Sequence, residues 1–153
     1  MMHSGERVTF LIVDDDDVAV MGMKRAISKI GLTNPTEVAR DGEEALSIIR
    51  DRQNDLKPYI VTLDLNMPRM GGLQFLEEVR RDPALQDSVI FVVTTSDAPA
   101  DITQAYAKNI AGYVVKDNAY ETLKQAIDML KSYVSVIRLP TESLAPHAEL
   151  RLV

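Results

Sequence analysis

The sequence predicts an α/β fold in which one parallel sheet is covered by helices on both faces. Short apolar runs rich in Val and Ile, which are typical of strands buried on both faces, recur along the chain. An amphipathic helical segment follows each run. Strict alternation of this kind requires right-handed crossovers and gives a doubly wound (βα)5 sandwich. The length of 153 residues suits one such domain.

The strand candidates are short and nearly free of polar residues. The four clearest cover residues 8–13, 59–63, 89–93 and 113–115, and residues 37–39 form a weaker fifth candidate. Each of the four clear runs ends at a polar or charged residue. We therefore expect five strands, of which the four clear ones each deliver a polar side chain to the carboxyl end.

Start and stop signals bound the five helices. The first covers about residues 18–30 and ends at Gly31. The second follows Asp41, which forms a pattern resembling a capping box with Glu44. The others cover about residues 72–81, 98–109 and 118–137, with Asn118 and Glu121 as the last cap. The pairs Lys24-Arg25 and Arg80-Arg81 are expected to lie on solvated helix faces.

Composition excludes several classes of function. The chain has no cysteine, so disulfides and thiolate metal sites are impossible. Its net charge of −6 disfavours nucleic acid as a partner, and no apolar run approaches the roughly 18 residues of a membrane span. We expect a cytoplasmic protein with an N-terminal tail (1–7), one folded domain (8–138) and a C-terminal tail (139–153).

Chemically useful side chains stand at the predicted carboxyl ends of four strands, where ligands gather in open α/β sheets. Asp14 and Asp15 follow the first strand, Asp64 follows the third, Thr94 follows the fourth, and Lys116 follows the fifth. Any one of these residues would be unremarkable alone. Their common position on separate strands predicts that three carboxylates, a hydroxyl and an ammonium group meet at one edge of the sheet.

This set of side chains suits phosphoryl chemistry. Clustered carboxylates repel one another unless a cation neutralises them, and Mg²⁺ (or Mn²⁺) prefers oxygen ligands. An aspartate can attack phosphorus if positive charge is nearby, and both the metal and Lys116 could supply that charge. Thr94 offers a hydroxyl to a phosphoryl oxygen. Asp16 and Asp17 are expected only to cap the first helix.

Four motifs make the chain resemble the receiver domains of two-component response regulators. They are LIVDD (11–15), LDLNMPRMGG (63–72), VVTTSDA (92–98) and GYVVK (112–116), and the resemblance covers about residues 8–137. The stretches VARDGEEAL and DLNMPRMGGLQFL are most similar to small stand-alone regulators partnered with bacteriophytochrome-type histidine kinases. The resemblance implies a flavodoxin-like sheet with strand order 2-1-3-4-5.

The resemblance also implies a role for each site residue. Asp64 would accept the phosphoryl group from a histidine kinase, and Lys116 would contact that group. The metal would be held by Asp14, Asp15, Asp64 and the backbone carbonyl of Asn66, while Thr94 and Tyr113 would act as the switch. Such a domain is a phosphoacceptor with self-catalysed phosphotransfer and slow autodephosphorylation, and is not counted as an enzyme.

Its output would be contact with a downstream protein target or a phosphotransfer protein. The apolar stripe of the fifth helix, together with the C-terminal region, suggests a homodimer seam. One position departs from the family pattern, because receivers usually have proline where this chain has Asp117 after Lys116. A cis bond without proline costs about 2.5–4 kcal/mol, so a trans bond is expected there.

Three alternative functions have different requirements. A phosphorylation-independent pseudo-receiver would not need the full acidic set. A phosphatase of the haloacid-dehalogenase type would need an acid two residues after the nucleophile, where this chain has Asn66. A flavodoxin-like flavin protein would need a loop rich in Ser, Thr and Gly after the first strand, where this chain has four aspartates.

Overall fold

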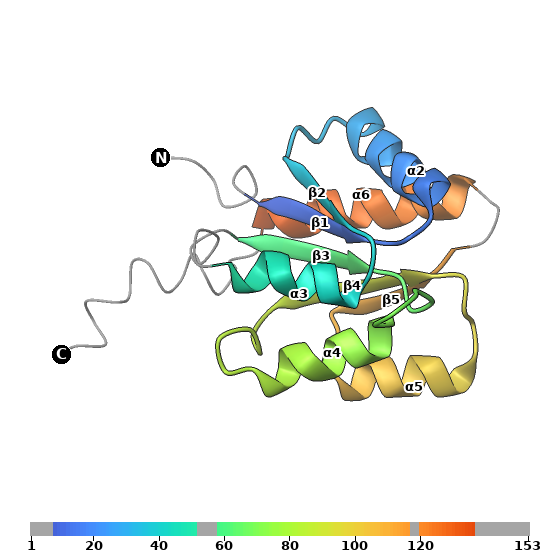
Figure 1. Ribbon diagram of the computed structural model, residues 1–153. Helices are drawn as coiled ribbons and strands as arrows, with labels where there is room; N and C mark the ends of the chain where they lie inside the picture. Colours follow the sequence, from blue (N-terminus) through green and yellow to red (C-terminus); the bar gives the residue numbers. More distant parts are fainter. Residues whose placement is uncertain (1–7, 52–57, 117–119, 137–153) are drawn as a thin grey trace.

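The computed structural model describes residues 8–51, 58–116 and 120–136 as a parallel sheet between two layers of helices (Figure 1). Its elements run in the order β1 (Thr9–Val13), α2 (Asp17–Lys29), β2 (Thr36–Ala39), α3 (Gly42–Arg50), β3 (Tyr59–Leu63), α4 (Gly72–Arg81), β4 (Val89–Thr94), α5 (Pro99–Ala107), β5 (Gly112–Val115) and α6 (Tyr120–Val136). The strands are ordered β2-β1-β3-β4-β5, and every neighbouring pair is parallel. The predicted fold class and strand order are confirmed.

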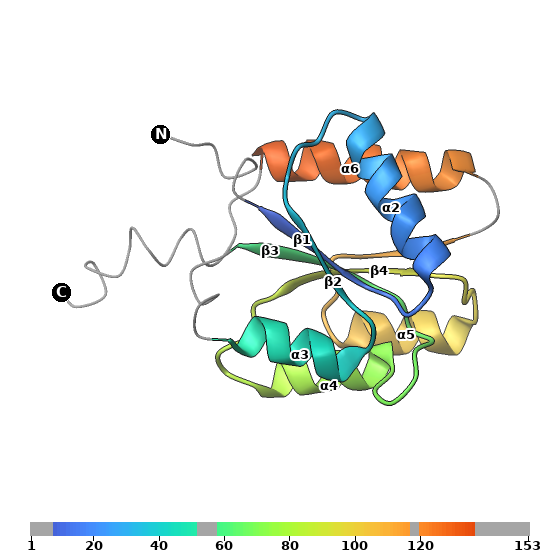
Figure 2. The same ribbon diagram turned by 45° about the horizontal axis from the view of Figure 1, so that its top comes forward.

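Alternation along the central strands divides the core into two layers (Figure 2). Leu11 and Val13 of β1 face α3, α4 and α5, where Phe75 and Leu76 are fully buried. Phe10 of β1 faces the opposite layer, formed with α2 and α6. Because β1 and β3 are mostly apolar on both faces, they are enclosed on both sides, as their largely apolar sequences predict.

The helix ends follow the predicted signals in most cases. Gly31 adopts a left-handed conformation (φ 85°) directly after the C-cap of α2, as expected for a glycine stop. Asp41 caps α3 by accepting the backbone N–H of Glu44. Helix α5 ends at Ala107, two residues earlier than expected, because Asn109 turns left-handed (φ 59°). The cap at Asn118 and both tails lie outside the described residues.

Arg80 differs from its predicted solvated position on α4. Its half-buried guanidinium donates hydrogen bonds to four backbone carbonyls, those of Gln86, Ser88, Lys108 and Asn109. Burial lowers the pKa of Arg80. The neighbouring Arg81 is exposed as predicted and pairs with carboxylates on its own helix. Arg80 therefore joins the α4–β4 and α5–β5 connections, and the expectation for this residue is wrong.

Helix α6 only partly follows the apolar stripe read from the sequence. Tyr133 packs edge to face on Phe91 of β4, with ring centroids 5.3 Å apart. In contrast, Met129 and Val136 are 45% and 79% exposed. Part of the stripe therefore covers the sheet, and part faces outward. Among the described residues, no helix combines the length and apolarity that a membrane span requires.

Gly72, the first residue of α4, lies against the backbone that follows β3. A Cβ atom at this position would lie 2.5 Å from the carbonyl oxygen of Asp64 and 2.8 Å from the Cα of Leu65. The N–H of Gly72 donates to the carbonyl of Leu65 at 3.0 Å. Only a residue without a side chain permits this approach. Gly72 therefore allows the first turn of α4 to lie directly against the end of β3.

The two glycines at helical positions 72 and 22 provide a matched test. Gly72→Ala should lower the free energy of unfolding by about 1–3 kcal/mol, because backbone atoms must move to admit the methyl group. Gly22→Ala should raise it by about 0.5–1 kcal/mol, because nothing lies within 4 Å of its added Cβ. Urea unfolding followed by circular dichroism measures both. Equal effects of the two substitutions would contradict the close packing at Gly72.

Candidate functional site

Strand pairing brings the acidic segment that follows β1 next to the one that follows β3. Strands β1 and β3 are neighbours, and Val13 is in register with Leu63. The residues that follow them are therefore adjacent, and the N–H of Asp64 donates to the carbonyl of Val13 at 2.9 Å. Asp14 and Asp64 thus reach the same point at the carboxyl edge of the sheet, as the sequence predicts.

Three carboxylates form a compact cluster at this edge. Asp14, Asp15 and Asp64 each place one carboxylate oxygen within 4.8 Å of the others. Asp14 and Asp64 are only 6% and 9% exposed, whereas Asp15 is exposed. Like charges at this separation in a partly dry site repel strongly. The cluster is therefore a place where a cation would be strongly favoured.

Thr94 contacts the carboxylate of Asp64 directly. Its Oγ1 donates a 2.7 Å hydrogen bond to Asp64 Oδ1, and Thr94 is fully buried at the end of β4. Burial raises the pKa of Asp64, although the hydrogen bond from Thr94 and the charge of Lys116 act in the opposite direction. Asp64 is thus a shielded carboxylate with one oxygen already oriented by a hydroxyl.

Lys116, the residue after β5, brings a positive charge to the cluster. Strand β5 lies at the edge of the sheet opposite to β2. The ammonium of Lys116 lies 2.9 Å from Asp14 Oδ2, and both side chains are largely buried, at 19% and 8% exposure. The other oxygen of Asp14 accepts the backbone N–H of Asp16 at 3.0 Å. One ammonium therefore faces three carboxylates. The bond from Lys116 to Asp117 lies outside the described residues.

The donor set fits Mg²⁺ or Mn²⁺. Three carboxylates from two adjacent loops supply the hard oxygen ligands that these ions prefer, with room for water at the exposed Asp15. Asn66, the predicted carbonyl ligand, is exposed two residues after Asp64, and its N–H lies 3.5 Å from Asp64 Oδ1. The backbone of Asn66 therefore runs beside the acidic cluster.

Tyr113 on β5 is tied to the loop that follows Thr94. Its hydroxyl donates to the carbonyl of Ser96 at 2.8 Å, and Ser96 Oγ donates to Asp101 on α5 at 2.5 Å. The sequence singled out Tyr113 but gave no partner for it, and it did not assign a role to Ser96. Two polar contacts thus connect β5 and α5 through the segment directly after Thr94.

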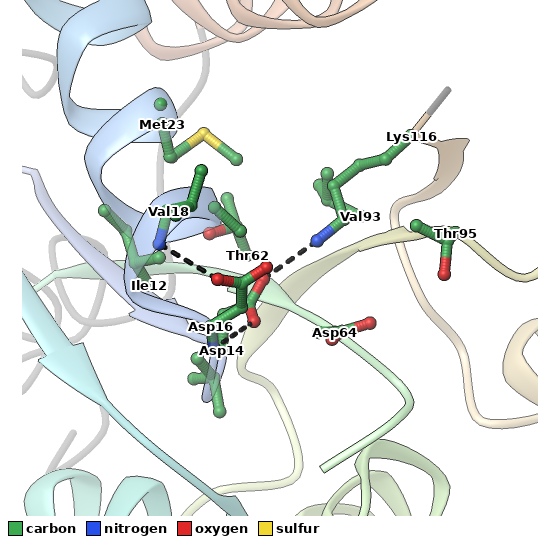
Figure 3. Close-up of a pocket in the computed structure, with 13 residues that line it drawn as sticks. Ile12, Asp14, Asp16, Val18, Met23, Thr62, Asp64, Val93, Thr95 and Lys116 are labelled. Carbon is green, nitrogen blue, oxygen red and sulfur yellow. Dashed lines mark hydrogen bonds and ion pairs between the residues drawn. The ribbon is translucent and has the colours of Figure 1, made fainter. Parts of the chain in front are cut away.

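A cavity of about 290 Å³ opens beside the acidic cluster, between α2 and the sheet (Figure 3). Its walls include Val18 and Met23 from α2, and Lys116 extends across it toward Asp14. The buried hydroxyl of Thr62 lines the cavity and has no hydrogen-bond partner among the described residues. No motif predicts this cavity, because neither Thr62 nor Val18 belongs to a recognisable pattern.

Comparison with known proteins agrees with this arrangement. A probable methanogenesis regulatory protein, FilR2 from Methanothrix harundinacea, is 31% identical over 135 residues, which are 87% of either chain. The cyanobacterial phytochrome response regulator RcpA superposes with a TM-score of 0.78 at 25% identity, over 91% of this chain and 99% of its own. Response regulator RPA3017 of R. palustris gives 0.75 at 28% identity, over 86% and 97%.

The family profile named response regulator receiver domain matches residues 10–128, which include all four motifs and every residue of the acidic cluster. The matched segment begins at the second residue of β1, contains β2 to β5 in full and ends about halfway along α6. The sheet order and the position of the acids at its carboxyl edge agree with this match. The chain therefore belongs to the response regulator receiver domain family.

Proposed function

We propose that residues 8–138 act as a receiver that accepts a phosphoryl group on Asp64 from a histidine kinase, in a Mg²⁺-dependent reaction. The observation that carries this proposal is the surroundings of Asp64. Its carboxylate is shielded, is oriented by Thr94 and shares a cluster with Asp14 and Asp15. A phosphoryl group at this point would meet a hydroxyl, an ammonium group and a cation site.

The transfer step requires a carboxylate nucleophile and compensation of negative charge. An oxygen of Asp64 forms the bond to phosphorus as the P–N bond of the kinase phosphohistidine breaks, and the imidazole leaves with the electron pair. When bound by Asp14, Asp15, Asp64 and the Asn66 carbonyl, Mg²⁺ would supply positive charge to the phosphoryl oxygens. Lys116, held 2.9 Å from Asp14, adds a second positive charge.

The acyl phosphate then alters the contacts of the switch residues. A phosphoryl group on Asp64 offers new acceptor oxygens to Thr94 and Lys116. Movement of Thr94 would act on the adjacent Ser96, whose carbonyl holds Tyr113. The effect is a shift in the surface formed by α5, β5 and α6. Water later removes the phosphoryl group, so the chain is a slowly self-dephosphorylating signal carrier and not a catalyst acting on a separate substrate.

The proposed partners follow from the family and from its named members. Receiver domains are partnered by histidine kinases, and a bacteriophytochrome-type kinase is supported by likeness to a phytochrome regulator and to one in red light signalling. The output is a protein contact or a phosphorelay in the cytoplasm, with neither nucleic acid nor membrane as a partner. The exposed Met129 and Val136 support a homodimer through α6 and the C-terminal region.

The alternative function is an interaction module that never carries phosphate. It requires neither the clustered carboxylates nor the buried contact between Thr94 and Asp64. Because burying like charges together is costly without a cation, a module without metal or phosphate would gain nothing from this set. The intact cluster therefore favours the phosphoacceptor.

Phosphorylation can be tested by intact mass. The full chain, incubated with acetyl phosphate and Mg²⁺, should gain the mass of one phosphoryl group, because Asp64 is the buried carboxylate of the cluster that Thr94 orients. Asp64→Asn should show no gain. Chelation of Mg²⁺ should abolish the gain in the wild-type chain. A mass gain that persists in Asp64→Asn would overturn the assignment of this residue.

The charge on Asp64 should destabilise the folded protein when metal is absent. Burial raises the pKa of Asp64, so the folded state loses stability as the pH rises from the unfolded-state pKa through this higher folded-state pKa. Asp64→Asn should therefore raise the free energy of unfolding at pH 7 by on the order of 1 kcal/mol. This stability difference between Asp64→Asn and the wild-type chain should disappear toward pH 3. Thermal and urea unfolding between pH 3 and pH 7 measure it.

Added Mg²⁺ should make the wild-type chain more stable than Asp64→Asn, which reverses their order in metal-free solution. Binding to the folded state raises the free energy of unfolding of the wild-type chain by RT ln(1 + [Mg²⁺]/Kd). Asp64→Asn should show little of this added stability, because it lacks one metal ligand. A wild-type chain that is more stable than Asp64→Asn without metal at pH 7 would contradict the predicted repulsion.

Thr94 should be needed for the response more than for the transfer. Thr94→Ala keeps the nucleophile and the metal ligands, so phosphoryl uptake should persist and slow by about 10- to 100-fold through loss of one hydrogen bond to a charged group. The chemical-shift changes that phosphorylation produces around Tyr113 should be lost in two-dimensional NMR spectra. Thr95→Ala, at the exposed neighbouring position, is the control and should retain them.

A further inference from the structure

The turn between β2 and α3 contacts both loops that carry the acidic cluster. It consists of Arg40 and Asp41, is followed by Gly42 as the first residue of α3, and contributes no residue to the cluster itself. Arg40 forms an ion pair with Asp17, in the first turn of α2. The loop that carries Asp14 and Asp15 is thereby linked to this turn.

The loop that follows Asp64 is held by the same turn through an arginine. Arg69 Nε donates to Asp41 Oδ2 at 2.6 Å, and its Nη2 also contacts this oxygen. Asp41 Oδ1 separately accepts the N–H of Glu44 at 2.9 Å. The side chain of Asp41 is 3% exposed, whereas that of Arg69 is 62% exposed. A buried, fixed carboxylate therefore anchors a side chain that would otherwise be free in solvent.

A second contact lies directly beside this ion pair. The N–H of Gly42 donates to the carbonyl of Met70 at 2.9 Å. The Met70 side chain also occupies the space where a Cβ on Gly42 would lie, at 2.6 Å from its Cγ. The backbone around residues 69 and 70 therefore rests closely on the start of α3, where α3 and α4 lie side by side (Figure 2).

These contacts fix the far end of the loop, while its base is closed by the bond from Gly72 N–H to the Leu65 carbonyl. Arg69 itself adopts a left-handed conformation (φ 59°), which costs free energy for a residue with a side chain. Asn66 lies between the closed base and the anchored end. The position of its carbonyl therefore depends on contacts that are made several residues away.

We propose that Arg69 is a positioning residue, which holds the β3–α4 loop on Asp41 so that the Asn66 carbonyl stays in place for a divalent cation at the acidic cluster. This inference rests on the proposed function, because it concerns the same metal site. Ligand-orienting contacts outside the ligand set commonly control metal affinity. Asp41 keeps its hydrogen bond from Glu44 when Arg69 is replaced, so α3 remains capped and the fold survives.

The test compares the Mg²⁺ affinity of four full-length proteins by isothermal titration calorimetry. Arg69→Gln should raise the Kd for Mg²⁺ by about 10-fold. Arg69→Lys, which retains the charge, should recover part of the affinity. Arg81→Gln is the matched control, because Arg81 is 63% exposed and also pairs with carboxylates, but on the far end of α4. Its affinity should equal that of the wild-type chain.

Hydrogen exchange of the Gly42 amide in metal-free protein provides a second readout, because this amide donates directly to Met70. Exchange should be faster in Arg69→Gln than in Arg81→Gln. If Arg69→Gln binds Mg²⁺ with wild-type affinity, the positioning role is overturned at any exchange rate, while the proposed function stands. A wild-type chain that binds no Mg²⁺ would instead overturn the proposed function, and the positioning role with it.

Discussion

The repulsion among three carboxylates at one edge of the sheet is the constraint on which the site depends. Parallel pairing of β1 with β3 forces Asp14 and Asp64 together, and Asp15 completes the cluster. Lys116 offsets only part of this charge through its contact with Asp14. The folded, metal-free protein therefore stores an unfavourable interaction that a divalent cation relieves. Attack on a phosphoryl group requires the same positive charge, so metal binding and phosphotransfer depend on one feature.

The rest of the structure keeps this cluster from relaxing. The two apolar layers make the sheet stiff, which fixes the strand ends from which the carboxylates project. Apolar packing constrains the loops less than the sheet, and polar contacts hold the loops in position instead. Arg40 and Asp41 link the two acidic loops to one turn, and Gly72 brings α4 against the backbone of Asp64. Separation of the carboxylates would break contacts in both the sheet and the loops.

The sequence predicts the strands, the helices and the meeting of the acids, because periodicity and strand ends are local properties. It does not predict which distant group a charged side chain will find. Arg80 was expected in solvent, yet it binds carbonyls in two connections that follow its helix and the next one. Arg69 lies in a motif, but its partner Asp41 is 28 residues away. Such pairs depend on loop conformations that no spacing rule encodes.

The central claim is that Asp64 carries the phosphoryl group, and reductive mapping tests it most directly. Borohydride converts an aspartyl phosphate to homoserine, which remains in the chain through digestion and peptide sequencing by mass spectrometry. After treatment of the full chain with acetyl phosphate and Mg²⁺, homoserine should occur at position 64, because that carboxylate is the one that accepts a hydrogen bond from Thr94. Homoserine at position 14 or 15, with unmodified Asp64, would contradict the account.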